Sequence, residues 1–380
     1  MDLSPVIQLS RELIQKESIT PDDKGCQKIL STLLMDAGFT CVHKRFGDVD
    51  NLFAWHGDKE GKSLMFLGHT DVVPTGDDSL WKHPPFSAEI DTDYLYGRGS
   101  ADMKAAVAAF TLAMIDYVKE NPDHNGKISL MVTSDEEGIA HDGVKKMMPH
   151  VSQNHDFDYC IVGEPSSSEK LGDVVRIGRR GSLHVNITIH GKQGHVAYPQ
   201  NAQNPIFLSA SFIQDLSEFL WDDGNEDFPP TSFQISSVKT SSNTSNIIPE
   251  SLKIQANFRY SPESSENSLK AQLEHLLKKH NLKYSLDWSL SGLPFHSKNN
   301  ILKNALHDSI YELNHITPTF NTAGGTSDGR FVAPSGVDVV ELGVINKTIH
   351  QIDECVLVKD VEKLENIYHK LINKLLNKIS

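Results

Sequence analysis

Residues 63–71 read SLMFLGHTD, a short apolar run that ends in polar side chains. An uninterrupted apolar run of this length predicts a strand buried on both faces. The same arrangement recurs at 128–138, ISLMVTSDEEG, and at 159–165, YCIVGEP. Helical spacing lies between such strands, over 26–37 before Gly38 and over 103–119. This alternation predicts an α/β domain with a central mixed sheet flanked by helices.

The middle of the chain follows a different pattern. Strands are expected at 176–191, 232–238, 252–260 and 282–288, and helices at 205–220 and 268–280. The order β-α-β-β-α-β is that of a ferredoxin-like α+β unit. We therefore expect one α/β domain, residues 1–180 and 294–380, interrupted by a smaller domain at 181–293.

Composition excludes several classes of protein. The formal net charge is −14, which argues against a nucleic-acid surface. No apolar stretch reaches about 18 residues, so no membrane span is expected. The N-terminus lacks a basic start and an apolar signal core, which favours the cytoplasm. The four cysteines are far apart and are expected to be reduced thiols.

Metal-binding side chains follow all three predicted strands. His69 follows the first, Glu136 and Glu137 the second and Glu164 the third, and ligands of open α/β sheets bind at such strand ends. Two more candidates are Asp102, before a helix, and His350, far down the chain.

Each candidate alone has an ordinary structural explanation. A histidine is usually a surface or core residue, Asp102 would be a helix cap, and the acidic triplet at 135–137 a solvated loop. Together, two imidazoles and three carboxylates without a thiolate suit Zn²⁺ or Co²⁺. Five ligands indicate two ions that share a bridging carboxylate. Their four positive charges would offset the crowded acids, leaving one glutamate as ligand and its neighbour as general base.

Four motifs carry a family resemblance. They are GHTDVVP at 68–74, YGRGSADMK at 96–104, SDEE at 134–137 and VGEP at 162–165. Together they resemble the di-zinc aminoacylase/carboxypeptidase family of hydrolases, and the likeness runs over essentially the whole chain.

The resemblance implies a role for each residue. His69 and Glu164 would bind one zinc, His350 and Glu137 the other, and Asp102 would bridge them, usually with a cis peptide after it. Asp71 would orient His69, and Glu136 would be the general base and later the general acid. The inserted domain would form a homodimer, and His195 would reach the partner's active site to stabilise the oxyanion.

Three further stretches narrow the resemblance: PPFSAEI at 84–90, GKQGHVAYP at 191–199 and GGTSDGRF at 324–331. They are similar to family members that release succinate from N-succinyl-LL-2,6-diaminopimelate in bacterial lysine and diaminopimelate biosynthesis. The residues that would line the substrate site, several of them from the opposite subunit, are Arg179, Ser182, Tyr198, Asn246, Arg259, Gly325, Thr326 and Asn346.

Two alternatives stay open. The metal centre would serve equally in an acetylornithine deacetylase or another N-acyl-amino-acid amidohydrolase of the family. A catalytically dead, binding-only member would usually have lost a ligand or the base, and all six such residues are present here.

Overall fold

The computed structural model describes residues 3–57 and 60–376 and divides the chain into two compact units. Unit 1 comprises residues 1–178, 296–321 and 327–380, and unit 2 comprises 179–295 and 322–326. The predicted division placed the inserted segment at 181–293. The short segment 322–326, which joins unit 2 from much later in the chain, gives no sequence signal of its own.

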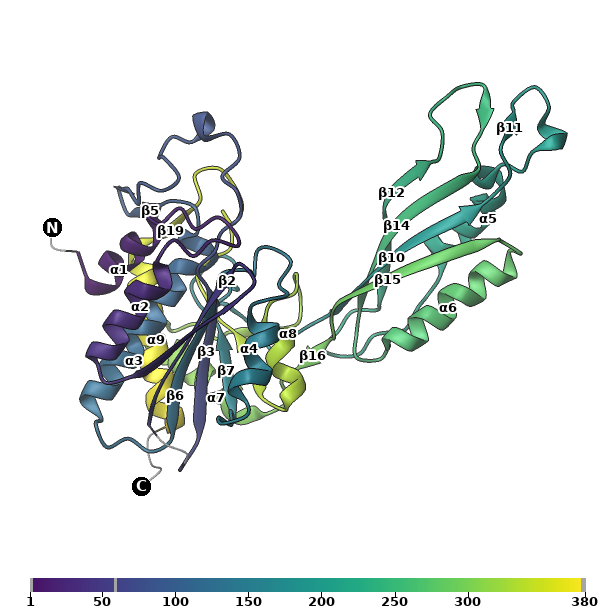
Figure 1. The fold of residues 1–380 in the computed structure, drawn as a ribbon. Coiled ribbons are helices and arrows are strands. Elements are labelled where there is room, and N and C mark those ends of the chain that lie inside the picture. The colour runs from purple at the N-terminus through teal and green to yellow at the C-terminus, as the bar shows by residue number, and fades with distance from the viewer. Residues whose placement is uncertain (1–2, 58–59, 377–380) are drawn as a thin grey trace. The chain divides into compact units, whose positions relative to one another are not determined.

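Unit 1 is built on a mixed sheet, of which eight strands lie in the described residues, in the order β1-β2-β6-β3-β7-β18-β8-β17 (Figure 1). The central strand β3 is parallel to both of its neighbours, and the pairs β1–β2 and β2–β6 are antiparallel. All seven residues of β3 and of β6 are buried, as their apolar runs predict. The strands are β1 (Thr40–Phe46), β2 (Val49–Gly57), β3 (Ser63–His69), β6 (Lys127–Thr133), β7 (Tyr159–Val162), β8 (Val174–Arg176), β17 (Thr319–Asn321) and β18 (Asp338–Glu341).

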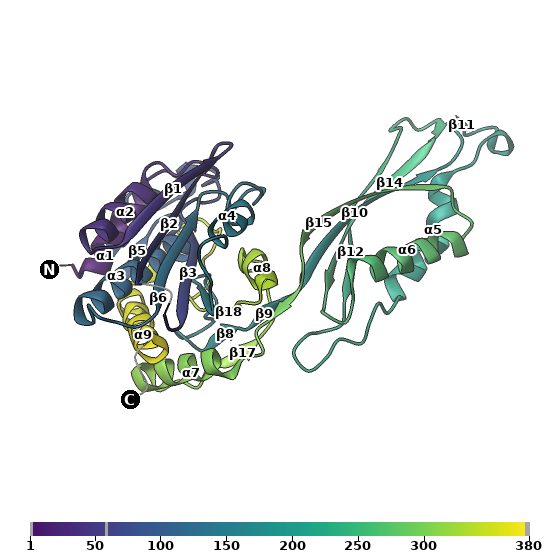
Figure 2. The same ribbon diagram turned by 60° about the horizontal axis from the view of Figure 1, so that its bottom comes forward.

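Helices cover both faces of this sheet, which confirms the predicted α/β class. In Figure 2, α1, α2, α3, α7 and α9 lie on one side of the sheet and α4 and α8 on the other. A small sheet of β4 (Ile90–Asp91), β5 (Tyr94–Tyr96) and β19 (Cys355–Leu357) completes the unit. The helices are α1 (Pro5–Ile14), α2 (Cys26–Asp36), α3 (Ala105–Glu120), α4 (Val144–Val151), α7 (Asn300–Asn314), α8 (Gly329–Val332) and α9 (Val358–Leu376).

Helix α3 begins later than the sequence pattern predicts. Its first residue is Ala105 rather than Met103, and residues 100–104 form an irregular turn in which Asp102 has φ −120° and ψ 114°. Lys104 occupies the N-cap position without a side-chain cap, so Asp102 is not the helix cap that its position allowed. The expected cis peptide after Asp102 is also wrong, because Thr20–Pro21 is the one cis bond in the described chain. The irregular turn itself aims the Asp102 side chain.

Unit 2 has the element order that the sequence predicts. Its strands β10 (Gly181–His190), β12 (Ser232–Thr240), β14 (Ser251–Tyr260) and β15 (Tyr284–Gly292) form an antiparallel sheet in the order β12-β14-β10-β15. Helices α5 (Pro205–Glu218) and α6 (Glu266–Lys279) lie together against one face (Figure 2). Two-residue strands β11 (Gly194–His195) and β13 (Ile247–Ile248) pair near the start of β14.

The single strand expected at 176–191 is wrong. The structure has β8 there, then β9 (Gly178–Arg179), then β10. Arg176 pairs with Asn321 and Glu341 in the sheet of unit 1, whereas Ser182 pairs with Arg259 in unit 2. One stretch with strand character therefore serves two sheets, and its sequence pattern does not show where the chain leaves the first. The other short strand, β16 (Phe295–His296), lies where the chain returns.

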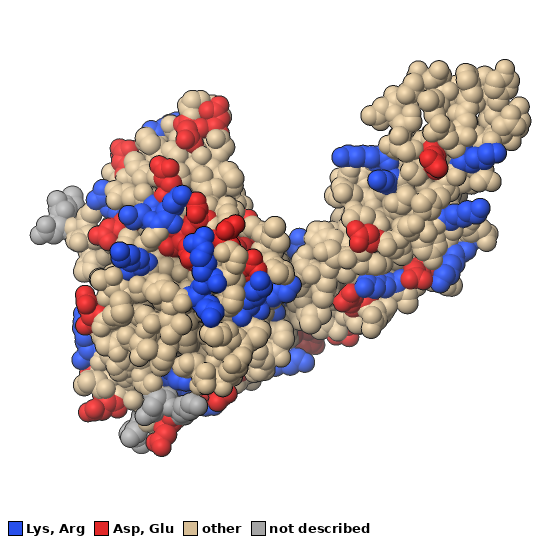
Figure 3. Space-filling model, viewed as in Figure 1, with Lys and Arg blue, Asp and Glu red and all other residues tan. Residues whose placement is uncertain are grey.

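Charged side chains are distributed without segregation on the visible face of unit 1. Figure 3 shows acidic and basic groups interspersed there. In the described part of the chain, no helix combines the length and the apolar character that a membrane crossing requires.

Candidate metal centre

The ends of the parallel strands bring the predicted ligands of unit 1 together. His69 is the last residue of β3, Glu136 and Glu137 follow β6, and Glu164 follows β7. Since β3 is parallel to β6 and to β7, all three ends lie at one edge of the sheet. Glycine permits close packing here, because a Cβ on Gly163 would lie 2.3 Å from Cε of Met103, the residue after Asp102.

Two groups of possible ligands share one carboxylate. The first contains His69, Asp102 and Glu164, and the second contains Asp102, Glu137 and His350. Within each group the ligand atoms lie within 4.8 Å of one another.

The distances define what each oxygen of Asp102 faces. Its Oδ1 lies 3.2 Å from His69 Nε2, and its Oδ2 lies 3.3 Å from His350 Nε2. His69 Nε2 is also 3.8 Å from Glu164 Oε1, and His350 Nε2 is 2.9 Å from Glu137 Oε1. A carboxylate with one oxygen toward each imidazole has the arrangement of a bridge between two ions.

The side chains fit divalent cations chemically. Oε1 of Glu164 is buried without a hydrogen-bond partner among the described residues. Burial, together with repulsion from Asp102 and Glu136, raises the pKa of Glu164 well above its usual value. Hydrogen bonds to Asp102 and Glu137 raise the pKa of His350 to about 10. Protonation therefore neutralises only part of the negative charge of the site, and bound cations would neutralise the rest. Imidazole and carboxylate are ligands that Zn²⁺ and Co²⁺ accept.

Residues 65–374 match the family profile described as Peptidase family M20/M25/M40. The chain belongs to this peptidase family. Hydrolysis of amide bonds is therefore its class of reaction.

Individual relatives agree with this family. A protein of Coxiella burnetii strain RSA 331, named succinyl-diaminopimelate desuccinylase, is 47% identical over 375 residues, which cover 98% of this chain and 100% of that protein. The structure of an M20 family metallo-carboxypeptidase from Sulfolobus solfataricus has a TM-score of 0.80, with 18% identity over 99% of both chains. A dinuclear metal-binding peptidase of the M20 family from Bacillus subtilis has a TM-score of 0.73, with 12% identity over 96% of both chains.

Asp71 contacts His69 through its main chain. The hydrogen bond to His69 Nδ1, 2.9 Å long, is made by the main-chain oxygen of Asp71, and its carboxylate Oδ1 lies 3.6 Å away. Oδ2 instead accepts from the N–H of Glu137 at 3.1 Å. Asp71 therefore connects two ligand segments, and its burial raises its pKa to about 6.

The Glu136 side chain makes no hydrogen bond to a described residue, and it is half-buried. Burial raises its pKa well above the usual range, and repulsion from Asp328 and Glu137 adds to this, whereas His69 opposes it. A raised pKa and a free carboxylate are the properties that general-base catalysis near neutral pH requires.

Glu354 is a structural partner that the sequence analysis missed. It is fully buried, and its Oε1 accepts from the N–H groups of Ala101 (2.8 Å) and Asp102 (3.0 Å). Its Oε2 accepts from the N–H of Gly99 at 3.1 Å and from Arg98 at 2.7 Å. This one carboxylate ties the turn that bears Asp102 to the segment four residues after His350. The one feature of the sequence that pointed to Glu354 was its position four residues after the candidate ligand His350.

Asp328 is a second missed residue. It is 3% exposed, and both carboxylate oxygens lack a hydrogen-bond partner in the described chain. Burial raises its pKa to about 7, and Arg330, 3.6 Å away, partly opposes this. Its occurrence within the motif GGTSDGRF was the signal available in the sequence.

The predicted substrate residues of unit 2 fall into two clusters. Ser182 pairs with Arg259 at the start of β10, and Arg179, just before it, donates to the carbonyl of Ala323 at 2.7 Å, close to Gly325 and Thr326 in sequence. Beyond the other end of β10, Val196 donates to the carbonyl of Asn246 and Tyr198 donates to that of His195. Asn346 belongs to unit 1, where its N–H donates to Ser167.

Proposed function

We propose that the chain is a metal-dependent hydrolase of N-succinyl-LL-2,6-diaminopimelate, releasing succinate and LL-2,6-diaminopimelate. The observation that carries the substrate is the 47% identity, over nearly all of both chains, to a protein named for this reaction. The geometry supports the chemistry through the two ligand groups that share Asp102. Substrate and product place the enzyme in lysine and diaminopimelate biosynthesis, which suits the cytoplasm.

His69, Glu164 and Asp102 would hold one ion, and His350, Glu137 and Asp102 the other. Zn²⁺ suits this set of donors, and Co²⁺ is a substitute. When bound, the ions would polarise the scissile carbonyl and make water more acidic.

Glu136 would move the proton. Its carboxylate accepts a proton from the attacking water and then donates it to the leaving amine, so one residue serves as base and as acid. Asp71 keeps the His69 ring and the Glu137 main chain in place, through the contacts at 2.9 and 3.1 Å.

The two clusters of unit 2 support a homodimer. They lie at opposite ends of β10, and a strand rises about 3.3 Å per residue, so ten residues separate them by roughly 30 Å. One small substrate does not span that length. We therefore assign Arg179, Ser182, Arg259, Gly325 and Thr326 to one subunit's site, and His195, Tyr198 and Asn246 to the site of the opposite subunit.

The test offers N-succinyl-LL-2,6-diaminopimelate and N-acetylornithine in parallel to zinc-loaded protein, with a chelator-treated control. Chelator-sensitive turnover of the succinyl substrate is the expected result. Turnover of N-acetylornithine alone would keep the metal chemistry and replace the substrate. Two bound ions with no turnover of either substrate would favour a binding-only protein.

A further inference from the structure

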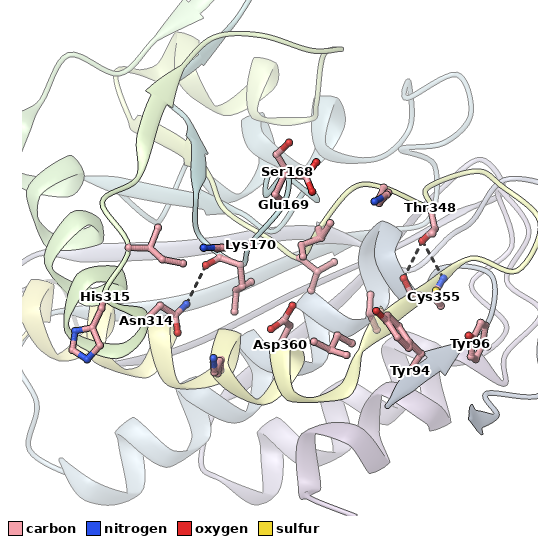
Figure 4. A pocket seen from close by; sticks show the side chains of 18 residues that line it. Tyr94, Tyr96, Ser168, Glu169, Lys170, Asn314, His315, Thr348, Cys355 and Asp360 are labelled. Carbon is pink, nitrogen blue, oxygen red and sulfur yellow. Dashed lines mark hydrogen bonds between the residues drawn. The ribbon is translucent and has the colours of Figure 1, made fainter. Parts of the chain in front are cut away.

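A cavity of about 750 Å³ lies in unit 1, apart from the metal centre (Figure 4). Its wall is formed by β5 and β19, the start of α9, the end of α7 and the loops around 168–171 and 344–348. None of its lining residues belongs to either ligand group. Its volume lies within the range of small-molecule sites, and the proposed hydrolysis gives it no role.

Asp360 is a buried carboxylate in this cavity. It belongs to the first turn of α9, is 9% exposed, and makes no side-chain hydrogen bond or ion pair with any residue the structure describes. Figure 4 shows it pointing from α9 into the cavity. Burial raises its pKa, with Lys363 and Lys359 opposing this at longer range. A position near the helix N-terminus offsets only part of the cost of burying a charge. A cationic group in the cavity would offset the rest.

Three lysines surround the same cavity. Lys170, Lys347 and Lys363 line it and are exposed, and in the described part of the chain none of them is within 4.0 Å of a carboxylate. One acid, Glu169, accompanies them. The rim thus has more positive than negative charge and attracts a carboxylate group.

Part of the remaining wall is apolar. Leu171, Val344 and Val356 are each less than 5% exposed and line the cavity. A ligand that complements Asp360, the rim lysines and these apolar side chains has an ammonium group, a carboxylate and an aliphatic chain.

We infer that this cavity binds a free aliphatic amino acid. Its ammonium group contacts Asp360, its carboxylate faces the rim lysines, and its chain lies along Leu171, Val344 and Val356. This inference does not depend on the proposed substrate, because it concerns a different site.

The first experiment compares three probes by calorimetric titration of the metal-loaded protein. L-norleucine carries all three features, hexanoate lacks the ammonium group, and pentylamine lacks the carboxylate. Norleucine is expected to bind at least tenfold more tightly than either of the others. Equal affinity for all three, or no binding of norleucine at millimolar concentration, overturns the inference.

The second experiment locates the ligand. Asp360→Asn should weaken norleucine binding at least tenfold, and Lys347→Met should weaken it several-fold. A control that alters charge outside the cavity, Asp116→Asn, should leave it unchanged. Because Asp360 has no partner to lose among the described residues, the Tm of Asp360→Asn without ligand should equal or exceed that of the parent. Binding that persists in Asp360→Asn, or disappears from metal-free protein, assigns norleucine to the metal centre and overturns the inference.

Discussion

Glu136 and Glu137 are adjacent in sequence but differ in their surroundings. Glu137 lies 2.9 Å from His350, whereas Glu136 has no hydrogen-bond partner among the described residues. A strand end turns successive side chains in different directions, so one glutamate can bind an ion while the other remains free. The acidic triplet therefore combines two tasks in neighbouring residues.

Replacing Glu136 tests this division. Glu136→Gln keeps the size of the side chain but removes the proton acceptor, so kcat should fall by about 10²–10⁴-fold. The number of bound metal ions should stay at the parent value, since Glu136 belongs to neither ligand group. Kinetics and metal analysis of the same preparation measure both, and Glu226→Gln on a surface loop is the matched control. Loss of metal in Glu136→Gln would make it a ligand and contradict its role as base.

Single residues also show which parts of the site sequence reasoning reaches. His69, Glu137 and Glu164 were found because each follows an apolar run, and a strand end is readable from the sequence. His350 follows no such run; it was a candidate by residue type alone, and the family resemblance assigned it to an ion. Glu354 was missed because its role arises from four contacts with residues about 250 positions away, and no local pattern encodes them.

At the scale of elements, the turn before α3 depends on a buried ion pair. Arg98 and Glu354 are 3% and 0% exposed, and the same carboxylate binds three main-chain N–H groups. Removing one partner of a buried pair leaves the other uncompensated, which costs about 3–5 kcal/mol. The shape of the turn, and with it the direction of Asp102, should depend on Glu354.

Glu354→Gln should therefore lower the Tm and weaken metal binding, because one amide oxygen replaces two carboxylate oxygens. The double variant Arg98→Met/Glu354→Gln should be less destabilised than the sum of the single variants. Thermal unfolding and titration of metal-free protein with Co²⁺, followed by its absorption spectrum, check both effects. If Glu354→Gln has a lower Tm but binds Co²⁺ with the parent's absorption spectrum, the metal site is unchanged. Glu354 would then contribute to stability alone.

Helices α9 and α7 each carry a glutamate, and the surroundings shift the pKa values of the two in opposite directions. Burial and repulsion from Asp116 and Glu362 raise the pKa of Glu365 to about 7, and ion pairs with Lys370 and Lys374 lower that of Glu312, on α7, to about 2. A carboxyl group whose pKa is raised on folding destabilises the fold progressively as pH rises from its unfolded pKa to its folded pKa. A carboxyl group whose pKa is lowered on folding stabilises the fold when the pH lies above the pKa of that group in the unfolded chain.

Glu365→Gln should therefore raise the Tm at pH 8 by more than at pH 5.5. At pH 8 the free energy of unfolding should rise by about 1 kcal/mol after allowance for solvent screening. Glu312→Gln should lower the Tm at both pH values, since its carboxylate is ionised and paired throughout. Thermal unfolding at the two pH values measures both variants. A Tm gain for Glu365→Gln that is the same at pH 5.5 and pH 8 would contradict the electrostatic cause.

The element boundaries show where sequence reasoning stops. Strands β3, β6 and β7 and helices α2, α3, α5 and α6 were predicted to within a few residues, because apolar periodicity marks them. The break within 176–191 was not, since both of its halves are strands and they differ only in the sheet they join. Nor was the segment 322–326, whose place in unit 2 depends on contacts such as that between Ala323 and Arg179.

At the scale of the whole molecule, the proposed dimer makes each active site depend on two chains. Glu136 and the ligands come from one chain, and His195 comes from the other. If so, a chain without its base and a chain without His195 have complementary defects. In their mixed dimer, one site combines an intact Glu136 with an intact His195, and the other site lacks both.

Mixing the variants Glu136→Gln and His195→Ala should therefore restore activity that neither has alone. After equal mixing and full exchange of subunits, half of the dimers are mixed and each has one intact site, so activity should reach about a quarter of the parent value. Mixing Glu136→Gln with His69→Ala is the control, because both defects lie in the same half of the site and no gain is expected. Activity that stays at the sum of the His195→Ala and Glu136→Gln preparations, with subunit exchange verified by mass, would assign His195 to its own chain's site or remove it from the reaction.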